Sequence, residues 1–434
     1  MSARTSRARE AARPRSYDQC VLAVRTMEET SSFYRRVRRV QTRVLRFAGL
    51  LPLKGRTHRF AGTVLVSAYV NFAFAAVSSV YVWAFVDDCA NRRFNPDITS
   101  ELFSFVGFHF RFMYIFSRRK ELTRMFGYVE SLWRGVASEE KAHVRGFVRK
   151  VSRLSCCYSG IILTTITLYV LSSQLPQLTA EAVNGTIRRA LPYPFYVDVQ
   201  DSPGYEVLLG VQIVCLLTVT QTSVCVDTAI AFLIMIACGH FRLIRVRLGA
   251  IARHIEESEQ RQQRAPTGDE GALDFDRSDE GIRRRVRECV AYHSEMLEFC
   301  NDINTLSSEI FMVELISTTY NLSLIGILLA GSMPLAEKFK FAPVLLILTT
   351  QLFVCQYPPD LLLQESVAVA DAAYMVPPFR NDRLRVDRLL LTLLARSQIP
   401  YQLLAGGQIK LSIESFGNMI RGAVSFFTVL RNFN

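Results

Sequence analysis

Hydrophobic positions gather into seven long runs that charged connections separate. A run of about 18 or more apolar residues predicts a helix that spans a bilayer. The second run is short and contains His109 and Arg111. The fourth and sixth are longer than a bilayer needs, so we expect both to continue as helices into an aqueous region. The pattern predicts an all-α membrane protein with the spans Ala61–Val86, Leu102–Phe116, Leu154–Leu175, Val207–Cys238, Leu306–Ala330, Phe341–Ala373 and Leu411–Phe433.

The seventh run is unusually polar for a membrane span. It follows the Gly406-Gly407 turn, and polar groups at this density are costly against lipid, so they should face protein or water. Two interpretations stay open: a helix that lines a path, or a last packing helix whose polar groups bond to its neighbours. The polar residues are Glu414, Asn418, Arg421, Ser425 and Asn432.

Basic residues mark one side of the membrane. The chain is 50% hydrophobic and 21% charged, with a net charge of +12. Arg and Lys are dense before the first span and after the second, fourth and sixth, whereas the opposite connections are poor in them. This asymmetry predicts a cytoplasmic N-terminus and an extracellular C-terminus. We interpret the charge as an orientation signal and expect no nucleic-acid partner. We expect the first span to be its own uncleaved signal, and Asn184-Gly185-Thr186 to be a glycosylation acceptor outside the cell.

Amphipathic stretches in the predicted cytoplasmic connections have no bilayer to enter. The connection Phe241–Thr305 has a charged centre, Arg261–Glu280, which we expect to be a flexible linker between the helices Leu243–Glu256 and Ile282–Leu306. Another helix is expected at Arg383–Ser397. These helices either cover one subunit or join subunits, and the wide apolar surface of Arg383–Ser397 favours assembly. The predicted units are residues 1–60 (cytoplasmic), 61–240 (spans one to four), 241–305 (cytoplasmic), 306–376 (spans five and six), 377–409 (cytoplasmic helix) and 410–434 (span seven).

No pattern of catalytic residues is present, so we expect no enzyme. The sequence lacks a Walker loop, a nucleophile elbow and an HExxH motif. Its ten cysteines include no CxxC pair and its six histidines lack ligand spacing, so we expect no disulfide framework, metal or cofactor. The acidic residues in or beside spans are expected to pair with arginines: Asp227, Glu309, Glu314, Glu365 and Asp371. The residues themselves leave receptor, channel and transporter open.

Several segments in order carry a resemblance to a known family. They are Leu191–Phe195, Pro203–Glu206, Cys238–Phe241, His293–Asn304, Gln364–Tyr374, Arg396–Pro400, Ala405–Gly407, Leu411–Phe416 and Ser425–Thr428. With these segments the chain resembles an insect odorant receptor over almost its whole length. It departs from the family pattern at Met375–Phe379, where many members have a Trp.

The resemblance implies an odorant-gated, non-selective cation channel in the plasma membrane of olfactory sensory dendrites. Members assemble as tetramers with a shared co-receptor subunit, through a cytoplasmic anchor domain and a central pore lined by span seven. The connection Phe241–Thr305 is shorter than that of the co-receptor, and the end at Leu430-Arg431-Asn432 differs, so we expect an odorant-specific subunit. A gustatory receptor is the main alternative, although the TYxxxxxQF pattern of that family is missing; a secondary transporter is a more distant one.

The resemblance also implies where the functional residues lie. A small volatile ligand is expected in the outer half of the bundle, between spans two, three, four and six. Helical facing and depth select Phe105, Phe108, His109, Thr165, Tyr169, Leu208, Gln212, Phe341 and Leu345. By alignment of the terminal residues, Val429 and Phe433 fall on the family's gate positions and Asn432 on its polar filter position. Val429 and Phe433 are four residues apart and share one helical face.

Overall fold

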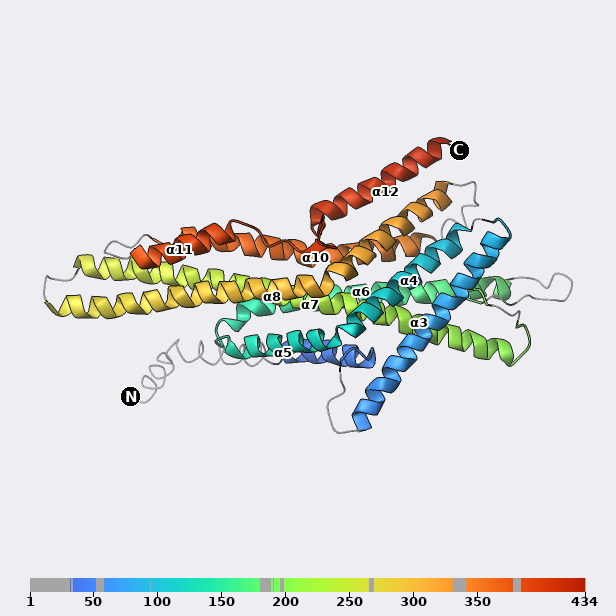
Figure 1. Ribbon diagram of the computed structural model, residues 1–434, viewed down its shortest axis with the longest axis horizontal. Helices are drawn as coiled ribbons and strands as arrows, with labels where there is room; N and C mark the ends of the chain where they lie inside the picture. The colour runs from blue at the N-terminus through green and yellow to red at the C-terminus, as the bar shows by residue number, and fades with distance from the viewer. Residues whose placement is uncertain are drawn as a thin grey trace, which may run out of the picture.

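Two helices longer than any membrane crossing run along the molecule: α7 (Gly204–Arg264) and α8 (Asp269–Ala330) (Figure 1). They contain 61 and 62 residues, which corresponds to roughly 90 Å each at the α-helical rise. In this computed structural model the described residues are 32, 34–51, 58–93, 95–179, 189, 191–195, 199–264, 269–330, 341–377 and 384–433. The predicted glycosylation acceptor Asn184 lies outside them.

The remaining helices surround the first two. Residues 34–47 are helical, and the other elements are α3 (His58–Ala90), α4 (Pro96–Ser117), α5 (Arg119–Gly135), α6 (Lys141–Thr179), α10 (Phe341–Tyr374), α11 (Leu384–Ser397) and α12 (Ile413–Phe433). α7 packs against α6, α10 and α8, and its middle is buried on all sides. α11 packs along α8 and α10 toward one end of the molecule, which we call the α11 end (Figure 1).

Each of the seven predicted spans falls on a helix, although α12 begins at Ile413, two residues after the predicted start of the seventh span. By length and hydropathy, three segments of the described residues reach what a membrane crossing requires: Gly62–Ala90, Lys141–Leu171 and Gly204–Ser258. The helices α4, α8 and α12 carry charged residues such as Arg111 and Glu314, which lower the mean hydropathy of their apolar stretches. Large apolar side chains on the outer helices are exposed, among them Leu65 at 69% and Phe72 at 66%, as expected for surfaces that face lipid.

The flexible linker predicted across Arg261–Glu280 is wrong for most of its length. α7 continues to Arg264 and α8 already begins at Asp269. Glu and Arg are good helix formers, and ion pairs one turn apart support this part of α8, including Arg284 Nε to Glu288 Oε1 at 3.2 Å. Charge density alone therefore misled the prediction. The amphipathic helices expected at Leu243–Glu256, Ile282–Leu306 and Arg383–Ser397 are confirmed as parts of α7 and α8 and as α11.

A short hairpin anchors the start of α12. β1 (Leu404–Ala405) pairs antiparallel with β2 (Ile409–Lys410), and the turn has positive φ at Gly406 and Gly407. A Cβ on Gly406 would lie 2.6 Å from Met312 Cε, so the turn requires glycine for its conformation and for its approach to α8. Ser308 Oγ donates to the Leu404 carbonyl at 2.8 Å, and the Ile413 amide donates to Asp360 Oδ1 at 3.1 Å. The hairpin thus ties the base of α12 to α8 and α10.

Candidate functional site

A cavity of about 530 Å³ lies among the helices, away from the α11 end. Its walls come from α4, α6, α7, α8 and α10, with Tyr81 of α3 on one side. The volume is within the range of small-molecule sites, and most of the lining is aromatic or aliphatic. We call this space the bundle cavity.

Four of the nine predicted ligand-binding residues line the bundle cavity: Phe105 and Phe108 from α4, and Thr165 and Tyr169 from α6. The predicted location between spans two, three, four and six is therefore close to the cavity that the structure contains, although α8 also contributes. The Phe105 ring is buried and stacks on Tyr81, with ring centroids 5.1 Å apart.

The other predicted residues have different surroundings. His109 stacks on Phe74 of α3 at 5.3 Å and does not line the cavity. Gln212 bonds the backbone of Tyr193, with its Nε2 donating to the carbonyl at 3.2 Å. Leu208 is half-buried and does not line the cavity, and the side chain of Phe341 is outside the described residues. Leu345 packs behind the cavity wall, against an apolar cluster that includes the lining residues Ile325 and Leu348.

Sequence reasoning missed several lining residues, although one spacing could have revealed some of them. Tyr158, Ile162, Thr165 and Tyr169 are four, three and four residues apart, so they share one face of α6, and all four line the cavity. Ser223 of α7 and Gln351 of α10 also line it. Nothing in the local sequence shows that these two helices meet α6 at that depth.

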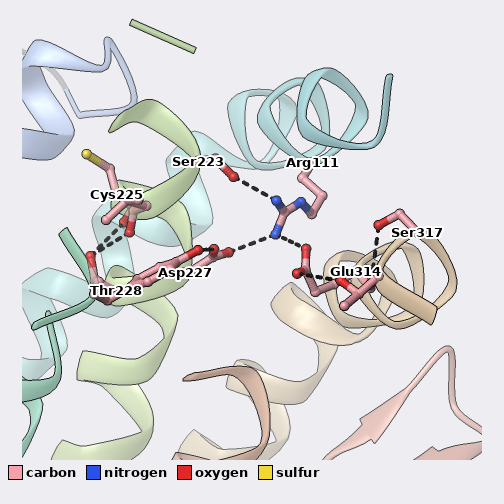
Figure 2. A network of polar contacts seen from close by, with 10 residues as sticks. Arg111, Ser223, Cys225, Asp227, Thr228, Glu314 and Ser317 are labelled. Carbon is pink, nitrogen blue, oxygen red and sulfur yellow. Dashed lines mark hydrogen bonds and ion pairs between the residues drawn. The ribbon is translucent and has the colours of Figure 1, made fainter. Parts of the chain in front are cut away.

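A buried ion network lies beside the cavity (Figure 2). Arg111 of α4 is 2% exposed, and it pairs with Asp227 of α7 and Glu314 of α8. Its Nη1 lies 2.9 Å from Asp227 Oδ1, and its Nη2 donates to Ser223 Oγ at 2.7 Å. Tyr158 donates to the other Asp227 oxygen at 3.0 Å. One guanidinium therefore joins three helices that are far apart in the sequence, and this group is called the Arg111 network below.

The Arg111 network and the bundle cavity share side chains. Tyr158 and Ser223 bond to the network and line the cavity. The Arg111 guanidinium carbon lies 5.0 Å from the centroid of the Phe108 ring, which also lines the cavity. Displacement of these side chains by a ligand would act directly on the contacts that join α4, α7 and α8.

The predicted pairing of acidic span residues with arginines is confirmed for three residues. Asp227 and Glu314 pair with Arg111. Glu365, near the end of α10, lies 2.8 Å from Arg245 and 3.5 Å from Arg242 of α7. These contacts give the carboxylates a structural role between helices.

The exposed and packed faces of α12 differ in chemistry. Phe416, Met419, Ile420 and Ala423 pack against the bundle. Glu414, Asn418, Arg421 and Ser425 are exposed and follow one another at spacings of four, three and four residues. They form one polar face, the α12 stripe, on which Arg421 donates to Asn418 at 2.5 Å. In a membrane, an exposed stripe of this kind requires protein or water against it.

The predicted gate and filter residues lie in the last turns of α12. Val429, Phe433 and Asn432 belong to the helix, but their side chains are outside the described residues. Val429 is four residues beyond Ser425 and Asn432 is seven beyond it, so by helical spacing both positions fall on the face of α12 that Ser425 occupies.

The family model described as 7tm Odorant receptor matches residues 98–424, which include the walls of the bundle cavity on α4, α6, α7, α8 and α10 and most of α12. The chain belongs to the odorant receptor family. Odorant receptors are membrane receptors and not enzymes, in agreement with the lack of a catalytic motif in the sequence.

Curated relatives of this odorant receptor are diverse. It is 25% identical over 253 residues to Odorant receptor Or2 of Anopheles gambiae, covering 56% of this chain and 61% of that relative. It is 25% identical over 342 residues to the Putative odorant receptor 85d of Drosophila melanogaster, covering 76% of each chain. The first match thus spans less than two thirds of that relative's length.

The fold of this odorant receptor matches solved structures. The olfactory receptor OR5 from Machilis hrabei, solved in complex with eugenol, superposes with a TM-score of 0.69 at 12% identity, covering 94% of this chain and 100% of that chain. A structure of the same receptor described without a ligand gives a TM-score of 0.70, covering 92% and 100%. At this identity the likeness shows a shared fold.

Proposed function

We propose that the chain is the odorant-binding subunit of a heterotetrameric, ligand-gated, non-selective cation channel. A small volatile ligand binds in the bundle cavity, and the α12 helices of four subunits line the pore. The partners are a co-receptor subunit and membrane lipid, and the site of action is the plasma membrane of a sensory dendrite. The observation that carries the proposal is the α12 stripe, because a span with this exposed face needs water or other subunits beside it.

The bundle cavity supports the ligand-binding part of the proposal. It is enclosed by several helices and largely apolar, as a small volatile molecule requires. The related Machilis hrabei receptor was solved with eugenol, a small aromatic molecule. The shared side chains Tyr158, Ser223 and Phe108 offer a route from bound ligand to the helices around the Arg111 network. The Asp360 and Ser308 contacts then connect α10 and α8 to the base of α12.

Exposed apolar side chains at the α11 end support assembly there. Leu391 is 61% exposed and Ile399 is 63% exposed. Tyr374 and Met375, at the end of α10, are also exposed. On the predicted topology this region is cytoplasmic, where no lipid can cover these side chains, so contacts with neighbouring subunits are the expected cover.

Expression in oocytes with and without a co-receptor, against a panel of volatiles, tests the proposal. We expect ligand-evoked cation current only with both subunits. Val429→Ser should raise the current without odorant, because a polar residue wets an apolar constriction. Leu430→Ser, on the packed side of α12 by helical spacing, is the matched control and should leave basal current unchanged. Asn432→Asp and Asn432→Lys should change divalent permeation in opposite directions. Unchanged gating and selectivity in all these variants at normal surface levels would place the pore elsewhere.

A further inference from the structure

The bundle cavity contains acidic groups that an apolar ligand does not explain. Asp97 and Glu101 of α4 both line it, whereas no Lys, Arg or His is found among the described residues of the lining. Arg111, whose guanidinium lies over the Phe108 ring of the lining, already faces two carboxylates. The described lining of the cavity is therefore acidic.

Glu101 lacks a partner within the described part of the chain. Its carboxylate forms no hydrogen bond or ion pair there, although the side chain is only partly exposed. Asp97 lies in the first turn of α4, where its charge favours the helix N-terminus. Glu101 is one turn further in, and carboxylates four residues apart on a helix repel each other. The helix terminus thus accounts for Asp97 but not for the position of Glu101 in the cavity wall.

Aromatic rings surround this part of the cavity. Tyr81 and Phe105 are buried and stack on each other at 5.1 Å, and both line the cavity with Glu101. Tyr169 also lines it and uses its hydroxyl to donate to the Pro192 carbonyl at 2.6 Å, so its ring is the part offered to a ligand. Ring faces next to a carboxylate are a favourable environment for an organic cation.

We propose that the ligand is a volatile amine that binds in its protonated form. Its ammonium group donates to the Glu101 carboxylate, and its apolar body lies among Tyr81, Phe105 and Tyr169. A neutral amine can reach the receptor through air and gain its proton in water, so volatility and a bound positive charge are compatible. This inference rests on the proposed function, because it names the ligand class of the same cavity.

Matched ligands on one skeleton test the charge. Wild-type receptor with a co-receptor is exposed to 2-phenylethylamine, 2-phenylethanol and ethylbenzene. We expect the amine to be the most potent. Glu101→Gln should reduce the potency of the amine by about 10- to 100-fold, which is the usual contribution of a hydrogen bond to a charged group. The potency of the alcohol should stay within about twofold of the wild-type value. Asp87→Asn, an exposed acidic residue near the end of α3 that does not line the cavity, is the matched control and should change neither.

The outcomes separate this inference from the proposed function. Equal potency of amine and alcohol on the wild type, or an equal shift of both in Glu101→Gln, overturns the amine assignment and leaves the channel standing. A second outcome is a receptor that reaches the surface normally and gives no current with any ligand, while the amine still raises the melting temperature of the purified wild type but not of Glu101→Gln. This outcome contradicts the channel and supports the amine assignment. Absence of both current and stabilisation contradicts both.

Discussion

Replacing Arg111 with Met removes the only cation of the described Arg111 network, which is buried between α4, α7 and α8. Asp227 and Glu314 would then face each other's helices without a counterion, and both side chains are almost fully buried. Ser223 loses the hydrogen bond that Arg111 donates to it, whereas Tyr158 can still donate to Asp227. Because the network joins α4, α7 and α8, we expect a loss of global stability and not only a local change.

The expected cost follows from the burial. Breaking a buried ion pair by removing one partner costs about 3–5 kcal/mol, since the remaining charge is left uncompensated. This is a decrease between about 100-fold and several thousand-fold in the ratio of folded to unfolded receptor. Arg124→Met is the matched control: Arg124 is 71% exposed and lies 3.9 Å from Asp302, so its loss should change stability by less than about 0.5 kcal/mol.

Thermal unfolding in detergent, read as the monodisperse fraction on size-exclusion chromatography of a fluorescent fusion, measures the effect. Arg111→Met should lose its folded peak at a markedly lower temperature than wild type or Arg124→Met. Adding Asp227→Asn and Glu314→Gln should recover much of the loss, because a fully neutral set no longer buries an unpaired charge. Equal melting of the two single variants, or a triple variant less stable than Arg111→Met, would refute the reasoning.

Three further predictions follow from single contacts. Leu391→Asp should reduce tetramers on native gels without loss of folded subunit, because Leu391 is exposed in the single chain. Leu393 is buried within its own chain, so Leu393→Asp should instead destabilise the subunit itself. Equal effects of the two substitutions would contradict an assembly surface at α11. Burial, with Arg396 nearby, lowers the pKa of His293 to about 4. Between pH 6.5 and 4 the unfolded state therefore binds a proton that the folded state does not, and the free energy of unfolding should fall by up to about 1.4 kcal/mol per pH unit. The same pH dependence of the melting temperature in His293→Gln would contradict this. Phe108→Ala should weaken ligand potency by at least about tenfold, whereas His109→Ala should not, because only Phe108 lines the cavity; dose–response curves that shift equally in both would place the ligand elsewhere.

The sequence predicted where helices form better than where they end. Apolar runs located a helix at every predicted place, because burial and lipid contact both demand apolar residues. The lengths of α7 and α8 were underestimated at Arg261–Glu280, where a charged segment that lacks apolar periodicity is still helical. The Gly406-Gly407 turn was predictable, since only glycine readily adopts two successive positive φ values in a tight turn.

The site was only partly predictable because it is made by contacts between helices. Facing within one helix could select Thr165 and Tyr169, but it could not show that His109 turns to Phe74 of α3. In the sequence, Arg111 is a charged residue in a short apolar run, which is unfavourable for a membrane span. In the structure it is the group that joins α4 to Asp227 and Glu314. No local pattern encodes which distant helix supplies the partner.

Thiol accessibility of α12 tests most directly whether this helix lines a ligand-opened pore. Ser425→Cys places a thiol on the exposed α12 stripe, and Ala423→Cys places one on the face that packs against the bundle. Each variant is expressed with a co-receptor and treated with a positively charged methanethiosulfonate during ligand application. We expect rapid loss of ligand-evoked current for Ser425→Cys, with little change for Ala423→Cys or the unmodified chain. Equal sensitivity of the two variants, or full current in treated Ser425→Cys with the thiol shown to be modified, would contradict it.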